Sequence, residues 1–120
     1  MYSIPAIGLV AAGGALGAVL RYLAVLLATR LSPVPFPLGT MLVNVIGSLL
    51  MGVLLARVES DAARLLMITG VLGGFTTFSA FSGDALQLVQ RGQIVSAGIY
   101  IIGSVVLALG AVWAGWNMGR

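Results

Sequence analysis

Four long apolar runs constrain the fold of this chain more than any other feature. They cover residues 4–28, 38–56, 65–87 and 94–116, and a helix needs about 20 apolar residues to cross the hydrocarbon core of a bilayer. Of the 120 residues, 60% are hydrophobic and 8% are charged, which is more apolar surface than a soluble domain of this size buries. We therefore expect an all-α integral membrane protein, with residues 1–120 forming a single domain of four membrane-spanning helices.

The third run contains a stretch, residues 70–83, whose composition is unfavourable for a continuous helix. Gly73 and Gly74 are adjacent, and each costs roughly 1 kcal/mol in a helix interior relative to Ala. Hydroxyl side chains, which compete for backbone hydrogen bonds, follow them and alternate with phenylalanines. Non-helical backbone at membrane depth is tolerated only where it is buried in protein or lines a wet cavity. We expect a helix broken between Gly73 and Thr77, facing something small and polar. The alternative is a continuous helix with a small-residue packing face.

Two strongly polar side chains lie inside the first two runs. Arg21 follows Gly13 and Gly17, whose spacing allows close helix approach. An arginine within the membrane is either a functional group or a side chain that extends to the nearby interface. Asn44 lies in the second run, and a buried amide needs hydrogen-bond partners. It either joins two helices or presents its NH₂ group to an anion path, and the residues alone leave both alternatives open.

The arginines favour no single orientation of the chain in the membrane. In a four-span arrangement one side of the membrane would hold three arginines, Arg57, Arg64 and Arg120. The other side would hold two, Arg30 and Arg91, with Arg21 near that side. Because the bias of basic residues in short loops sets orientation, we expect insertion in both orientations and an antiparallel, dual-topology homodimer. The net charge of +3 forms no basic stripe, so no nucleic-acid partner is expected. The chain contains no Cys and no His, and we find no nucleophile–base pair or metal-ligand set, so no enzymatic activity is expected.

Three motifs carry a resemblance to a known family. The segments GGALGAVLRY (13–22), GTMLVNVIGS (39–48) and GGFTTFSAF (73–81) resemble those of the Fluc, or CrcB-type, fluoride channels of microorganisms. The resemblance extends over all four runs. It implies a passive, fluoride-selective channel in the inner cell membrane, which lowers intracellular fluoride through two pores in an antiparallel homodimer.

The resemblance also assigns roles to individual residues. Residues matching the fluoride pathway are Asn44, Phe78, Ser79, Phe81, Tyr100 and Ser104. Arg21 and Asp84 match the vestibule, although the family usually has Glu where Asp84 stands. Ala108 stands where the family has a further hydroxyl group. A structural Na⁺ at the dimer centre is implied, with the backbone carbonyls of Gly73 and Thr76 as its ligands.

The residue types fit fluoride chemistry independently of the resemblance. Fluoride is small and tightly hydrated, so a pathway must replace its water with oriented donors such as amides, hydroxyls and the positive edges of aromatic rings. Several weak sites in sequence conduct better than one tight site. A proton-coupled multidrug exporter is the nearest alternative, but it needs a carboxylate deep in the membrane, whereas Asp84 lies towards a span end. A non-transporting assembly subunit would leave the phenylalanine–hydroxyl stretch unexplained.

Overall fold

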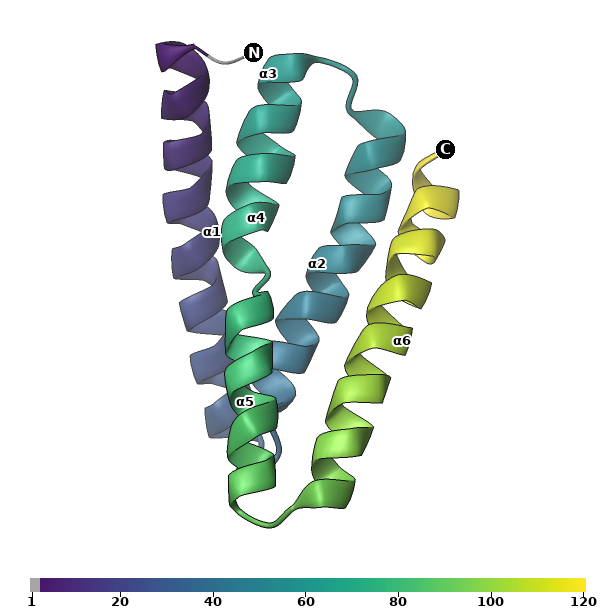
Figure 1. The fold of residues 1–120 in the computed structure, drawn as a ribbon. Helices are drawn as coiled ribbons and strands as arrows, with labels where there is room; N and C mark the ends of the chain where they lie inside the picture. Colours follow the sequence, from purple (N-terminus) through teal and green to yellow (C-terminus); the bar gives the residue numbers. More distant parts are fainter. Residues whose placement is uncertain (1–2) are drawn as a thin grey trace.

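The computed structural model describes residues 3–120, which form helices joined by short connections. The elements in chain order are α1 (Ile4–Leu31), α2 (Leu38–Arg57), α3 (Asp61–Ala63), the π-helical segment η1 (Arg64–Leu72), α4 (Gly73–Phe75), α5 (Phe78–Gln90) and α6 (Ile94–Gly119). Helices α3 to α5, with η1, follow one another as a single interrupted rod (Figure 1). The described residues therefore contain four candidate membrane spans, and the prediction of an all-helical membrane protein is confirmed.

The first helix begins and ends at local sequence signals. The Ser3 hydroxyl accepts a hydrogen bond from the Ala6 amide at 3.2 Å, which satisfies one of the free donors of the first turn. Helix α1 continues to Leu31, three residues beyond the predicted end at Ala28. It stops before Pro33 because a proline disfavours helical geometry in the residue that precedes it.

A glycine closes the turn between α5 and α6. Gly92 has φ +78°, a left-handed conformation that glycine adopts without a steric penalty. Its N–H donates to the carbonyl of Val89, and the N–H of Gln93 donates to the carbonyl of Leu88. This Schellman motif ends α5 and turns the chain so that α6 returns across the molecule (Figure 1).

The helices associate mainly as two pairs, and glycines form both contacts. Helix α1 packs along η1 and α4, and α2 packs along α6. A Cβ atom added at Gly13 would lie 2.9 Å from the Gly70 Cα, and one at Gly17 would meet the carbonyl oxygen of Val71. The close approach expected of Gly13 and Gly17 is therefore confirmed.

The third span is broken, but over a shorter segment than predicted. Gly73 and Gly74 are helical, and the extended residues are Thr76 (φ −89°, ψ 157°) and Thr77 (φ −152°, ψ 123°). A Cβ atom at Gly74 would lie 2.5 Å from the Gly14 carbonyl oxygen. The glycine therefore permits close packing against α1, and it does not itself form the break.

A cluster of buried apolar residues lies between α5 and α6. It consists of four buried residues with three half-buried neighbours: Phe81, Leu88, Ala97 and Tyr100, against Phe36, Met41 and Ala85. Large apolar side chains are exposed on every long helix, as in Val95 at 77%. The longest dimension of 47 Å is close to the roughly 40–45 Å of a bilayer with its headgroup regions. Both observations fit a surface that faces lipid.

Candidate functional site

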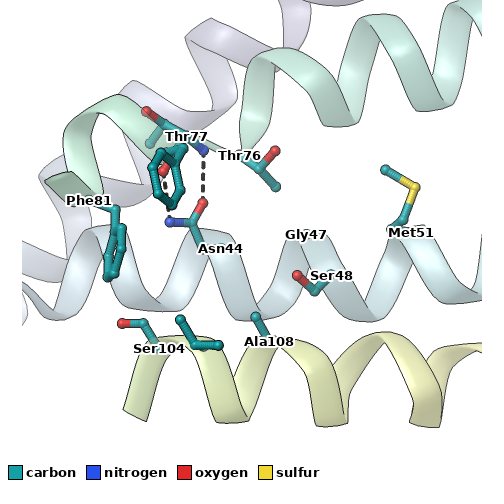
Figure 2. Close-up of a pocket in the computed structure, with 11 residues that line it drawn as sticks. Asn44, Gly47, Ser48, Met51, Thr76, Thr77, Phe81, Ser104 and Ala108 are labelled. Atoms are coloured by element: carbon teal, nitrogen blue, oxygen red, sulfur yellow. Dashed lines mark hydrogen bonds between the residues drawn. The ribbon is translucent and has the colours of Figure 1, made fainter. Parts of the chain in front are cut away.

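Asn44 holds the broken backbone of the third span. Its Nδ2 donates to the carbonyl of Thr77 at 2.9 Å, and its Oδ1 accepts from the amide of the same residue at 2.8 Å (Figure 2). This pair of bonds joins α2 to the break, so the interhelical role weighed for Asn44 is present. An amide NH₂ carries two N–H donors, and Asn44 also lines a cavity. Its role as an anion donor therefore stays a prediction that the geometry permits.

The same hydrogen bonds change the partners of the neighbouring carbonyl groups. In a continuous α-helix each N–H donates to the carbonyl four residues earlier. The Thr77 N–H would then donate to the Gly73 carbonyl, but it donates to the Asn44 Oδ1 instead. The Ala80 N–H would donate to the Thr76 carbonyl, but it donates to the Thr77 hydroxyl at 3.0 Å instead. The break thus separates the carbonyl oxygens of Gly73 and Thr76 from their helical donors.

Arg21 also contacts the break. Its Nε donates to the carbonyl oxygen of Gly74 at 3.0 Å. The helical donor of that carbonyl would be the N–H of Phe78, on the far side of the break. The guanidinium group is therefore held against α4 by a hydrogen bond to the backbone, which is not the arrangement of a side chain that simply extends to the interface.

A cavity of about 290 Å³ lies between α2, the break, α5 and α6 (Figure 2). Its polar lining comes from Asn44, Ser48, Thr76, Thr77 and Ser104, and its apolar lining includes Phe78, Phe81 and Ala108. Among residues 3–120, none with a formal charge lines this space. Four of the six predicted pathway residues meet here, namely Asn44, Phe78, Phe81 and Ser104.

Ser104 has a buried hydroxyl with an unmet hydrogen-bonding requirement. The residue is 5% exposed, and within the described residues its Oγ has no hydrogen-bond partner. Leaving a buried hydroxyl unpaired costs about 1–3 kcal/mol, so such atoms commonly face a partner that the protein itself does not supply. Ser104 therefore offers the cavity a hydroxyl donor that is not used by any other residue in the described part of the chain.

The other two predicted pathway residues lie outside this cavity. Ser79 is exposed at the start of α5, where its Oγ lies 3.2 Å from the Thr77 Oγ1. Tyr100 is fully buried, and its hydroxyl donates to the Asp84 Oδ2 at 3.2 Å. Tyr100 and Ser104 nevertheless share a buried face of α6, as their spacing predicts.

Aromatic rings connect the cavity to the Tyr100–Asp84 pair. The centroids of Phe78 and Phe81 are 5.4 Å apart, and those of Phe81 and Tyr100 are 5.2 Å apart. Phe81 is 9% exposed, whereas Phe78 is 77% exposed at the open side of the cavity. Phe81 thus touches the Asp84-bound tyrosine on one side and borders the cavity on the other.

The predicted vestibule residues share a second cavity. Arg21 and Asp84 line a space of about 630 Å³, together with Thr40 and Thr77. Thr77 borders both cavities, so the break separates the Arg21–Asp84 space from the Asn44–Ser104 space.

Sequence reasoning missed Ser48 and Thr77 as site residues. Ser48 lies four residues after Asn44, so both fall on one helix face, and this spacing was a usable signal. Thr77 carries no such signal, because its importance comes from an extended conformation that positions its hydroxyl at Ala80. Ala108 lines the cavity and contributes no hydroxyl, as its sequence position indicates.

Comparisons with known proteins give a consistent family. Residues 8–116 match the model of the family described as CrcB-like protein, Camphor Resistance (CrcB). A protein of Agrobacterium fabrum named "Fluoride-specific ion channel FluC" is 48% identical over 119 residues, covering 95% of each chain. Proteins of the same name from Rhizobium johnstonii and Paracoccus denitrificans are 56% and 52% identical, covering 93% and 92% of this chain and 94% and 91% of their own.

Proposed function

This chain belongs to the CrcB-like protein family, and on that premise we propose that it is a fluoride-specific ion channel. The relatives that match along almost the full chain bear that name, and the four apolar helices make it a multi-pass membrane protein. Family membership indicates a channel and not an enzyme. Passive export of fluoride across the inner membrane, lowering its intracellular concentration, is the activity we assign.

The unpaired hydroxyl of Ser104 is the observation that carries this proposal. A fluoride ion that leaves water needs hydrogen-bond donors, and a buried donor without a protein partner is what such an ion requires. Asn44 lines the same cavity, and its NH₂ group carries a second N–H donor besides the one given to the Thr77 carbonyl. Phe81 lines this cavity too, and an aromatic ring that turns its edge to an anion offers the positive side of its quadrupole without a formal charge. Several weak, uncharged donors let an ion bind and leave again.

We assign the Arg21–Asp84 space as the aqueous vestibule. A guanidinium group there attracts anions, and its hydrogen bond to the Gly74 carbonyl keeps it at the break. Ser79 and Tyr100 remain proposed members of the pathway. Ser79 lies beside Thr77 at the start of α5, and Tyr100 lies between Asp84 and Phe81.

We further propose that the chain acts as an antiparallel homodimer with two pores. The 290 Å³ cavity is bordered by Phe78, which is 77% exposed in the single chain, so a second copy would complete its wall. The balanced arginines support insertion in both orientations. Reporter fusions at the C-terminus should report both sides of the membrane; a single orientation would contradict the antiparallel arrangement.

The backbone break fits the sodium ion that the family implies. Among residues 3–120 no group of His, Cys, Asp or Glu could hold a metal. The carbonyl oxygens of Gly73 and Thr76 have lost their helical donors, and carbonyl oxygens of broken membrane helices are suitable ligands for Na⁺. We propose that these two carbonyls hold a structural Na⁺ at the dimer centre, where the ion supplies charge compensation for converging backbone dipoles.

The rival functions have less support. A proton-coupled multidrug exporter needs a carboxylate deep in the membrane, whereas Asp84 lies in α5, towards the end of the third span. The comparisons favour the channel over both this exporter and a non-transporting assembly subunit.

Growth of a fluoride-sensitive bacterium tests the proposed function in cells. A strain whose own fluoride exporter is deleted should regain growth in millimolar-range fluoride when it produces this chain. Production of the Phe81→Ile variant at equal membrane levels should not restore growth. If the wild-type chain reaches the membrane and gives no protection, the proposed function is wrong.

A further inference from the structure

Two side chains accept backbone N–H groups at the break of the third span. Asn44, on α2, accepts the Thr77 N–H at 2.8 Å. The Thr77 hydroxyl accepts the Ala80 N–H at 3.0 Å. Each bond removes a donor that an uninterrupted helix would direct to a carbonyl four residues earlier.

We propose that the side chains of Asn44 and Thr77 are positioning groups that keep two backbone carbonyls free to bind a cation. The carbonyls are those of Gly73 and Thr76, so this inference rests on the proposed function and its sodium ion. Asn44 acts from a neighbouring helix and Thr77 acts from within the break. The cation contacts neither side chain in this scheme; they act through the amide donors that they hold.

The hydroxyl of Thr77 is the more informative of the two groups. Thr77 is the residue before α5, with φ −152° and ψ 123°, and its side chain caps that helix. Without the hydroxyl, the Ala80 N–H would lose its acceptor. Refolding of the extended Thr76–Thr77 segment into helix would satisfy this N–H again, with the Thr76 carbonyl as its acceptor. The carbonyl that the cation needs would then be occupied.

Asn44 reinforces the same arrangement from outside the helix. Its Nδ2 donates to the Thr77 carbonyl at 2.9 Å, which ties the Thr77 backbone to α2 (Figure 2). Because Asn44 is also assigned to the fluoride pathway, its replacement would change two properties at once. Thr77 therefore gives the cleaner test.

The test compares Thr77 variants that keep or lack a hydrogen-bond acceptor. Thr77→Ser keeps the hydroxyl, whereas Thr77→Val has nearly the same shape without it, and Thr77→Ala lacks both the hydroxyl and the branch. Thr69→Val is the matched control, since Thr69 is an exposed threonine in η1, away from the break. Each purified full-length protein is heated in detergent over a series of sodium concentrations, with N-methylglucamine as the replacement cation.

The inference predicts that sodium affinity follows the acceptor and not the size of the side chain. Thr77→Val and Thr77→Ala should need at least about tenfold more sodium for half-maximal thermal stabilisation, and tenfold corresponds to about 1.4 kcal/mol. Thr77→Ser and Thr69→Val should keep the wild-type midpoint. The inference would be overturned if folded Thr77→Val or Thr77→Ala kept the wild-type sodium midpoint for thermal stabilisation. It would also be overturned if the thermal stability of the wild-type protein did not depend on sodium.

Fluoride release from liposomes separates this inference from the function on which it rests. Wild-type protein that releases fluoride but does not respond to sodium contradicts the cation inference alone. Wild-type protein that is folded and releases no fluoride contradicts the proposed channel itself.

Discussion

Replacing Ser104 by Ala should reduce fluoride conduction strongly while leaving the stability of the protein almost unchanged. The Ser104 hydroxyl is buried and, within residues 3–120, has no hydrogen bond to lose. Removing a buried group that does have a partner typically costs about 1–3 kcal/mol because that partner is left unsatisfied. Ser104→Ala leaves no such partner, so we expect the free energy of unfolding to change by less than about 0.5 kcal/mol.

The same substitution removes a donor from the proposed fluoride pathway. A hydrogen bond to a charged group is worth about 1.5–3 kcal/mol, and each 1.4 kcal/mol is a factor of about ten in rate. The rate of fluoride release should therefore fall about 10- to 100-fold. Ser96→Ala is a matched control, because Ser96 lies on the same helix but does not line the 290 Å³ cavity.

Two measurements on each variant decide the outcome. A fluoride electrode records release from liposomes, and denaturation of the purified protein records stability. Release from Ser104→Ala within about twofold of the wild-type rate would refute the reasoning. A large loss of stability would also refute it, because it would mean that the hydroxyl has a structural partner.

Three further substitutions probe other parts of the account. Phe81→Ile removes the aromatic edge beside the cavity and should abolish fluoride release while gel filtration still shows a dimer; release at the normal rate would exclude Phe81 from the pathway. Asn44→Asp places a carboxylate 2.9 Å from the Thr77 carbonyl and in an anion path, so electrode recordings should show no release; unaltered release would exclude Asn44. Gly17→Val forces a side chain into the Val71 carbonyl and should lower stability by at least about 2 kcal/mol in a denaturation assay. Gly110→Val, which has open space around it, should not; equal losses in both would contradict the packing described for α1.

The four spans were predictable because hydropathy and length decide them. Every predicted span overlaps a helix of the structure, and the main differences are longer ends. Helix α1 reaches Leu31 because the first residue that disfavours helical geometry is Ser32, which precedes Pro33. The third span starts at Asp61, where the Ser60 hydroxyl caps it by accepting from the Ala63 amide at 3.1 Å.

The position of the break was only partly predictable. Composition located the break between Gly73 and Thr77. The prediction relied too strongly on the low helix propensity of glycine, because Gly73 and Gly74 are helical in the structure. Gly74 is helical, and a glycine is needed there because close packing against Gly14 leaves no room for a side chain. The non-helical residues are set by hydrogen bonds from Asn44, which is 33 positions away from Thr77 in sequence. No pattern within the third span contains that information.

The site was predictable where residues share a helix face and less so where helices meet. The spacing of Tyr100 and Ser104 correctly placed both on one buried face of α6. It could not indicate that the Tyr100 hydroxyl pairs with Asp84 or that the Ser104 hydroxyl has no partner within residues 3–120. Both depend on how α5 packs against α6.

The most direct test of the account is fluoride release from liposomes that contain the purified protein. The liposomes are loaded with potassium fluoride, release is followed with a fluoride electrode, and valinomycin is added to let potassium carry the compensating charge. The account predicts little release before valinomycin and rapid release afterwards, faster than carrier turnover, with chloride released far more slowly under the same conditions. Folded, dimeric protein that releases no fluoride after valinomycin, or that releases chloride equally fast, would contradict a passive, fluoride-specific channel.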